Sequence, residues 1–272
     1  MNEILSAIKD SLREIYQTKE LSSIEYKGDG TLVTALDLKC HSIISARLKS
    51  LLPIVSEEDP STHSLIDSCD DYILIDPIDG TSACKRFFGE IGGQVGFGPL
   101  VGRVRNGNVI EAFYGNVMQR ALYHAKLGEG VRKASIYLSN TNEIVCEEWN
   151  QLIKPQDKPL RECALLFYAS SGEEMLTVRS LREKGKIETA YRFGGFANDC
   201  VRLAEGKEEL LLQYKASAWD ATATLFASEA GFEVLFDPKG SRARFMDWSI
   251  KQNNPVLIAP VELIDELIQE LI

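Results

Sequence analysis

Histidine, paired cysteine and positive charge are all scarce in this chain of 272 residues. It has three histidines, and none of its six cysteines forms a CxxC pair, so the sequence gives little support for a zinc site. The formal net charge of −10 argues against nucleic acid polymers and anionic membranes as partners. No apolar run approaches a membrane span, and the N-terminus lacks the pattern of an export signal. We therefore expect a soluble, cytoplasmic protein with reduced cysteines.

The bulk composition is that of a folded globular protein. Hydrophobic residues make up 44% and charged residues 26%, and the length suits one large or two modest domains. Short apolar runs alternate with amphipathic helical patterns, which indicates layered α and β structure with mixed sheets. The polar segment 139–162 contains Pro155 and Pro159 and is the best candidate for a boundary between two halves of the chain. We divide the chain into an N-terminal α+β subdomain, 1–145, and a C-terminal α/β subdomain, 146–272.

The hydrophobic periodicity predicts the elements around the polar motifs. In the first half we expect helices over 2–19 and about 38–51, the latter with Leu38, Ile44, Leu48 and Leu51 as its apolar face, and a buried strand over 72–75. In the second half we expect strands at 164–168, 210–213 and 232–236, and helices at 173–183, 197–205 and 219–231.

The strongest local motif is the segment 76–81, Asp-Pro-Ile-Asp-Gly-Thr. The strand before it should end at Asp76, which Pro77 keeps extended, and Asp79 should lie in a turn that Gly80 permits. Two carboxylates and the Ile78 carbonyl can then face one point, as a hard, oxygen-preferring cation such as Mg²⁺ requires. An Asx-turn at a strand end is an equally good interpretation of the motif taken alone.

The residues that follow this motif suit an anion. Thr81 offers a hydroxyl, and the N–H groups of Gly80, Thr81 and Ser82 would face phosphate oxygens if a helix begins here.

Three other acidic positions accompany the motif. Glu57 follows a short apolar run, Asp37 closes a Thr-x-x-Asp pattern, and Asp220 opens the helix expected at 219–231. Taken singly, Glu57 fits a solvated loop, Asp37 a capping box and Asp220 a helix N-cap. Their joint presence with Asp76 and Asp79 favours a shared metal site.

In this order the motifs resemble the inositol monophosphatase superfamily. The resemblance covers residues 27 to about 240 and is carried by five segments: Leu32-Val33-Thr34-x-x-Asp37, Ser56-Glu57-Glu58-Asp59, Asp76–Thr81, Leu203-Ala204-Glu205-Gly206 and Trp219-Asp220. It implies an α-β-α-β-α layered sandwich and a phosphomonoesterase with two or three Mg²⁺ ions per site. A covalent aspartyl phosphatase of the haloacid dehalogenase type is excluded, because Pro77 occupies the position of its nucleophile.

The resemblance also implies roles for individual residues. The metal ligands would be Glu57, Asp76, the Ile78 carbonyl, Asp79 and Asp220. The catalytic residues would be Asp37, Glu57 and Thr81, which would orient and help deprotonate a metal-bound water that attacks phosphorus directly. Phosphate and substrate would contact Gly80, Thr81, Ser82, Gly194 and Gly195.

The resemblance specifies the substrate less closely than it specifies the reaction. The segments Ser56–Asp59 and Gly89-Glu90 are similar to those of 3′(2′),5′-bisphosphate nucleotidases, while other segments depart from that branch, so inositol phosphate and nucleotide bisphosphate both stay open. Lys85, Arg86 and Arg192 are candidate contacts for a second anionic group. The resemblance further implies inhibition by lithium, and the sequence does not decide between a monomer and a homodimer. The alternative function is a catalytically silent relative that binds a phosphometabolite or metal.

Overall fold

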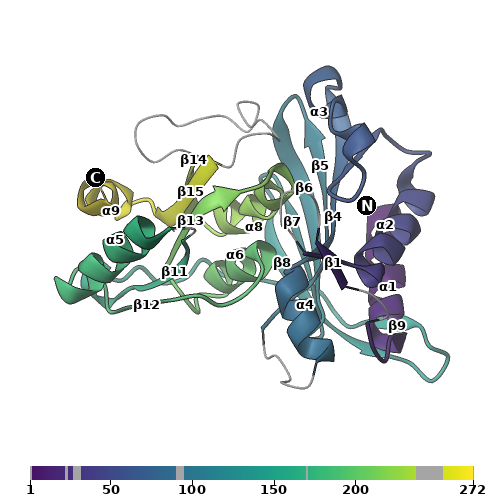
Figure 1. Cartoon of the computed structure of the whole chain (residues 1–272), viewed down its shortest axis with the longest axis horizontal. Coiled ribbons are helices and arrows are strands. Elements are labelled where there is room, and N and C mark those ends of the chain that lie inside the picture. The colour runs from purple at the N-terminus through teal and green to yellow at the C-terminus, as the bar shows by residue number, and fades with distance from the viewer. Residues whose placement is uncertain are drawn as a thin grey trace.

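Helices and sheets alternate in five layers (Figure 1). Helices α1 (Asn2–Gln17) and α2 (Ala35–Leu48) cover the outer face of the larger sheet, and α6 (Phe196–Ala204) and α8 (Thr224–Glu229) lie between the two sheets. Helices α5 (Gly172–Glu183) and α9 (Ile264–Leu271) cover the outer face of the smaller sheet. The predicted α-β-α-β-α sandwich is confirmed. The computed structural model describes residues 2–21, 24–26, 32–89, 95–169, 171–236 and 254–271, and Glu90 of the expected Gly89-Glu90 segment lies outside them.

The larger sheet is mostly an antiparallel meander in the order β10-β8-β7-β6-β5-β4-β3, with β9 paired to β8. Its strands are β3 (Ile54–Ser56), β4 (Asp71–Asp79), β5 (Gly98–Arg105), β6 (Asn108–Asn116), β7 (Ala121–Lys126), β8 (Gly130–Leu138), β9 (Ile144–Cys146) and β10 (Asn150–Gln151). A tight turn joins β5 to β6, because Asn106 and Gly107 adopt φ of 48° and 68° as a type I′ hairpin demands. Among the described strands of this sheet only β3 and β4 run parallel, and that pairing places two predicted ligands side by side.

The smaller sheet has the order β12-β11-β13-β15-β14. Its strands are β11 (Ala164–Tyr168), β12 (Thr189–Tyr191), β13 (Leu210–Ala216), β14 (Phe232–Phe236) and β15 (Asn254–Pro260). The predicted strands at 164–168 and 232–236 match β11 and β14, whereas β12, β15 and α9 were not predicted. The remaining described elements are short: β1 (Ile24–Tyr26), β2 (Leu32–Thr34), α3 (Leu65–Ser68), α4 (Thr81–Phe88), α7 (Ala218–Ala221) and two 3₁₀ turns, Pro60–Thr62 and Leu160–Glu162.

Apolar side chains fill the spaces between the layers. The central cluster joins the inner faces of both sheets through residues of α6 and α8, such as Val201 and Phe226. The outer clusters lie under α1 with α2 and under α5 with α9. Burial of apolar surface from both sides therefore holds α6 in place, and α6 reaches the site described below.

Two helix predictions were wrong in detail. Helix α2 buries Ile44 and Leu48 as predicted, together with Cys40, whereas Leu38 and Leu51 are half exposed. Leu51 lies beyond the helix, which ends at Leu48. The helix expected over 219–231 is two helices, α7 and α8, with Thr222 and Ala223 between them.

The transition between the sheets lies later than the proposed subdomain division. Residue 145 falls within β9, and β10 still belongs to the larger sheet, so the chain crosses between Gln151 and Ala164. The division at 145/146 stays a prediction. None of the described helices is long and apolar enough to cross a membrane.

Candidate active site

Two predicted ligands meet where β3 and β4 run side by side. Ser56 pairs with Ile75, so the next residues, Glu57 and Asp76, lie beside each other where β3 ends. The Glu57 N–H donates to the Ile75 carbonyl at 3.1 Å, which extends the pairing by one residue. Parallel pairing thus places side by side two carboxylates that are 19 positions apart in the chain.

Strand β4 continues beyond the point predicted. It runs to Asp79 and pairs with β5 through an irregular register between Asp76 and Asp79, so Asp79 lies on the strand rather than in a turn. The predicted Asx-turn is also present, because the Ile78 N–H donates to Asp76 Oδ1 at 3.0 Å. The two interpretations of this segment are therefore compatible. The irregularity lets both carboxylates face the same side of the strand.

Asp220 reaches these two carboxylates from the other half of the chain. Oxygen atoms of Asp76, Asp79 and Asp220 lie within 4.8 Å of one another. The prediction that Asp220 is a helix N-cap is wrong: it is the third residue of α7, and Ser217 is the N-cap. The Oδ2 atom of Asp220 accepts from the Ser217 N–H at 2.7 Å. Gln213 on β13 donates to the same oxygen at 3.3 Å. These bonds aim the carboxylate at β4.

Asp37 both caps helix α2 and contacts the predicted site. Its Oδ2 accepts from the Thr34 N–H at 2.9 Å and from the Thr34 hydroxyl at 2.5 Å. The Asp37 N–H in turn donates to Thr34 Oγ1 at 3.4 Å, which completes a capping box at the start of α2. Its Oδ1 accepts from the Thr81 hydroxyl at 3.0 Å, across 44 positions of sequence. The Thr81 hydroxyl also lies 3.2 Å from the Ile78 carbonyl. Asp37 thus joins α2 to the start of α4.

A helix begins at Thr81, as the anion interpretation requires. Gly80 is its N-cap with φ of 82° and no side chain to cap the helix, so the N–H groups of Thr81 and Ser82 face the opening at the helix N-terminus. A Cβ on Gly80 would lie 3.2 Å from the Cα of Gly195, which shows how closely the two backbones pass.

The N-terminus of α6 contacts the same carboxylates. The Ala197 N–H donates to Asp79 Oδ2 at 3.1 Å, and a Cβ at Gly195 would lie 2.2 Å from that oxygen. A Cβ at Gly194 would lie 2.5 Å from Asn198 Nδ2. The glycine pair therefore lets the backbone pack directly against Asp79 and Asn198.

One cavity of about 1070 Å³ contains nearly all of these groups. Every predicted site residue lines it except Asp37, which lies behind Thr81: Glu57, Asp76, Ile78, Asp79, Gly80, Thr81, Ser82, Gly194, Gly195 and Asp220. The structure adds residues that the sequence gave no signal for, among them Tyr168, Phe193 and Gln213. They come from segments without a motif, and only the packing of the two sheets brings them here.

The buried carboxylates are electrostatically unfavourable without a cation. Burial raises the pKa of Asp79 to about 7, although the α6 amides counteract it. Burial also raises the pKa of Asp76 and Asp220 well above the ordinary value, and neighbouring carboxylates raise it further. Burial also raises the pKa of Asp37. Within the described part of the chain no Lys or Arg lies within ion-pair distance of these four groups, so a hard divalent cation fits this donor set.

These pKa shifts predict a pH-dependent stability. In the folded, cation-free protein Asp79 keeps a proton between its ordinary pKa of 3.8 and about 7, whereas the unfolded chain has released it. Stability is therefore expected to fall as pH rises through that window, by about 1.4 kcal/mol per pH unit for each proton retained. His41 has a lowered pKa and acts oppositely near its ordinary value of 6.5, but Asp199, whose pKa burial also raises to about 7, acts in the same direction as Asp79. Thermal unfolding in EDTA from about pH 5 to about pH 8 measures the slope, and a melting temperature that rises throughout would contradict it.

Comparison with known proteins identifies the family. The model of the inositol monophosphatase family matches residues 2–271. The chain belongs to this family. Its members are phosphatases, and this member of the inositol monophosphatase family is accordingly an enzyme that hydrolyses phosphate esters.

Individual relatives in the inositol monophosphatase family differ in their substrates. An inositol monophosphatase of Mesembryanthemum crystallinum is 26% identical over 249 residues, 86% of this chain and 83% of that protein. The 3′(2′),5′-bisphosphate nucleotidase CysQ of Salmonella typhimurium is 25% identical over 219 residues, 79% of each chain. The suhB protein of Bartonella henselae has the same fold, with a TM-score of 0.77 at 18% identity, covering 100% of this chain and 97% of that one.

Proposed function

We propose that the protein is a Mg²⁺-dependent phosphomonoesterase that uses a water molecule, not a protein side chain, as its nucleophile. The observation that carries this proposal is the group of buried Asp76, buried Asp79 and partly buried Asp220, whose oxygens lie within 4.8 Å of one another. A solved inositol monophosphatase/NADP phosphatase of the same fold, complexed with Mg²⁺ and phosphate, has a TM-score of 0.75 and is consistent with it. Glu57 and the Ile78 carbonyl line the same cavity and would complete the ligand set.

Mg²⁺, when bound, supplies Lewis acidity and neutralises phosphate charge. Residues of the chain would accept the proton of the attacking water and bind the phosphate oxygens. The Thr81 hydroxyl donates to Asp37 Oδ1, so its lone pairs face away from Asp37 and accept from water. A proton that passes from water to Thr81 Oγ1 is matched by one that passes from Thr81 to Asp37 Oδ1. The N–H groups at the start of α4 hold phosphate oxygens beside this pair.

Phosphate release from a substrate panel tests the function. Inositol 1-phosphate, adenosine 3′,5′-bisphosphate and fructose 1,6-bisphosphate would each be assayed with Mg²⁺ and again with EDTA. We expect turnover of at least one compound with Mg²⁺ and none with EDTA. No hydrolysis under any metal condition would favour the alternative, a catalytically silent relative. Lithium inhibition and a cytoplasmic location remain predictions, and the choice between a monomer and a homodimer stays open.

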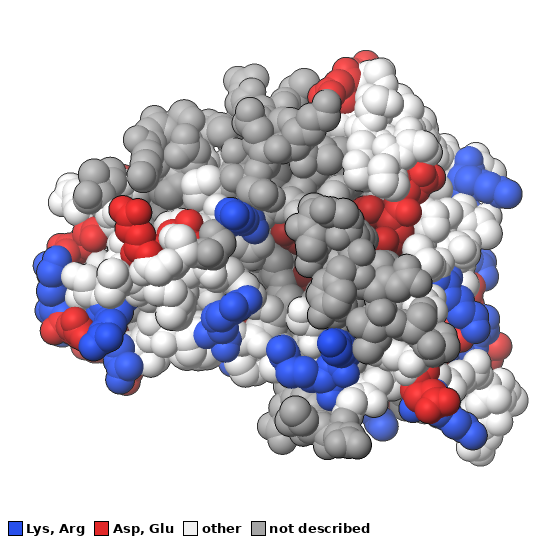
Figure 2. Space-filling model, in the orientation of Figure 1, with Lys and Arg blue, Asp and Glu red and all other residues white. Residues whose placement is uncertain are grey.

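The cationic rim of the cavity supports a substrate with a second anionic group. Lys85, Arg86 and Arg192 line the cavity and are exposed, and none of them forms an ion pair with another described residue. Lys and Arg side chains gather at the position of α4 on the face that Figure 2 shows. In a chain of net charge −10, unpaired cations beside a buried acidic group favour a multiply charged anion. We infer that a nucleotide bisphosphate suits this cavity better than an inositol monophosphate.

Neutralising the rim is expected to affect the two candidate substrates unequally. The double variant Lys85→Gln/Arg86→Gln should raise KM for adenosine 3′,5′-bisphosphate by about 5-fold to 10-fold, because exposed ion pairs each contribute up to about 1 kcal/mol. KM for inositol 1-phosphate should change by less than about 2-fold. Steady-state kinetics at low and high salt measure both. Arg161→Gln, an exposed arginine outside the cavity, is the control. Equal changes for both substrates would contradict the inference.

A further inference from the structure

Residues 192–195, here called the pocket wall, connect β12 to α6. All four line the cavity, and the backbone of Gly195 packs against Asp79. The wall has neither helical nor strand pairing of its own, so side chains outside it must hold its shape. Phe193 is its largest apolar side chain and is half-buried. The residues behind Phe193 therefore decide where this side of the cavity lies.

Arg202 of α6 supports the ring of Phe193. Its guanidinium carbon lies 3.9 Å from the ring centroid, at cation–π stacking distance. Tyr191, at the end of β12, meets the same ring edge-on, with centroids 6.4 Å apart and planes at 77°. Arg202 does not itself line the cavity. Any effect it has on a bound substrate passes through Phe193.

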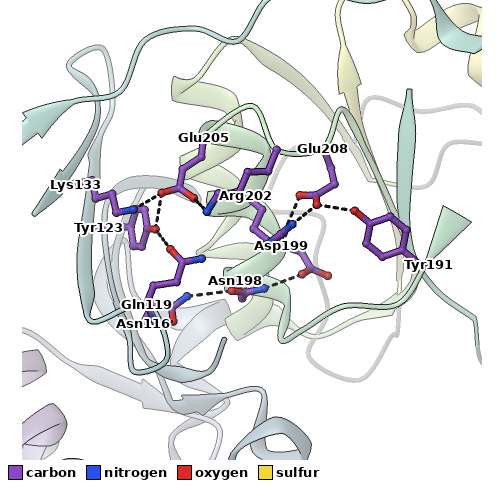
Figure 3. A network of polar contacts seen from close by, with 11 residues as sticks. Asn116, Gln119, Tyr123, Lys133, Tyr191, Asn198, Asp199, Arg202, Glu205 and Glu208 are labelled. Carbon is purple, nitrogen blue, oxygen red and sulfur yellow. Dashed lines mark hydrogen bonds and ion pairs between the residues drawn. The ribbon is translucent and has the colours of Figure 1, made fainter. Parts of the chain in front are cut away.

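Glu208 fixes the plane of the guanidinium. Arg202 Nε donates to Glu208 Oε2 at 2.8 Å, and Arg202 Nη2 donates to Oε1. Tyr191 donates its hydroxyl to the same Oε1 at 2.6 Å, and Figure 3 shows Arg202 and Tyr191 converging on Glu208 from opposite sides. The side chain of Glu208 is 1% exposed and that of Arg202 16%. A bidentate, buried pair holds a planar group far more rigidly than a lysine could, because an ammonium is a point charge.

We propose that Arg202 is a positioning residue for substrate binding: clamped by Glu208 and Tyr191, it holds Phe193 against the part of the substrate that leaves after hydrolysis. This rests on the proposed phosphomonoesterase function. Hydrogen bonds to the Asp79 and Asp220 carboxylates come from Ala197, Ser217 and Gln213. The clamp of Arg202, Glu208 and Tyr191 is hydrogen-bonded within itself and holds Phe193. It therefore acts on substrate affinity and leaves the metal site and the attack on phosphorus unchanged.

The test separates KM from kcat. For whichever of adenosine 3′,5′-bisphosphate and inositol 1-phosphate the wild type hydrolyses faster, Arg202→Lys should raise KM by about 10-fold, since small displacements of positioning groups have large effects. The value of kcat should stay within about 3-fold, and the Mg²⁺ concentration for half-maximal rate and inhibition by inorganic phosphate should not change. Phe193→Leu, which keeps the Arg202–Glu208 pair, should raise KM in the same way. Arg179→Lys, an exposed arginine on α5, is the control.

Three outcomes would overturn the proposal. One is an unchanged KM in folded Arg202→Lys. Another is a fall in kcat together with a shift in Mg²⁺ dependence, which would mean that α6 acts through Asp79. If Arg202→Lys does not fold, an unchanged KM in Phe193→Leu decides against the proposal. An inactive wild type would instead contradict the phosphomonoesterase function, so the two failures are distinguishable.

Discussion

Asp220→Asn is expected to reduce phosphate release by about 1000-fold while leaving the cation-free protein at least as stable as the wild type. The loss of rate follows because a metal-binding carboxylate is replaced by a weaker ligand, at several kcal/mol of transition-state stabilisation. The stability follows because Asp220 is partly buried beside Asp79, and burial raises its pKa well above the ordinary value. The asparagine oxygen can still accept from Ser217 N–H, so α7 keeps its cap.

Two measurements check this prediction together. Steady-state phosphate release gives the rate, and thermal unfolding with EDTA and with Mg²⁺ gives the stability of each state. We expect Mg²⁺ to raise the melting temperature of the wild type much more than that of Asp220→Asn. Asp265→Asn on α9 removes an exposed carboxylate and serves as the matched control. Near-normal turnover in Asp220→Asn would exclude this residue as a ligand.

Thr81→Ala is expected to lower kcat by about 100-fold or more with little change in KM. The variant removes the hydroxyl that connects the cavity to Asp37, and general acid–base contributions have about this size. It keeps the backbone N–H groups at the start of α4, so binding of phosphate oxygens should persist. Single-turnover and steady-state rates on the best panel substrate measure the effect.

Thr81→Ser is the matched control for this prediction. Serine retains an Oγ that can donate to Asp37, so its kcat should fall by less than about 10-fold. If alanine and serine variants lose activity equally, the hydroxyl is not what the reaction uses. If Thr81→Ala weakens Mg²⁺ dependence as strongly as Asp220→Asn does, the role of Thr81 is to order the Ile78 carbonyl, from which it lies 3.2 Å.

Local sequence patterns predicted the parts of the site that have local causes. The capping box of Thr34 and Asp37 and the helix beginning after Gly80 follow from interactions a few residues long. The strands β11 and β14 were placed correctly because their apolar runs are short and clearly bounded. The same reasoning ended β4 too early, since the continuation to Asp79 depends on pairing with β5, a partner distant in sequence.

For the helix that contains Asp220, local patterns predicted an element that is too long. The apolar pattern over 219–231 continues without a visible break, so sequence reasoning joined α7 and α8. The tertiary structure bends the chain there so that Asp220 can turn toward β4. Gln213, Phe193 and Arg202 had no motif at all, and their roles come from contacts between elements.

By itself the sequence indicated which chemistry the chain can perform, because the acidic residues, the Gly80-Thr81 pair and Pro77 in place of a nucleophilic aspartate are properties of the residues in order. Only the tertiary structure decided that Asp76, Asp79 and Asp220 share one point while Asp37 supports Thr81 from behind. It also decided which side chains surround the substrate. The physical reason is that burial and long-range pairing set distances between segments, and no local propensity encodes a distance across more than a hundred residues.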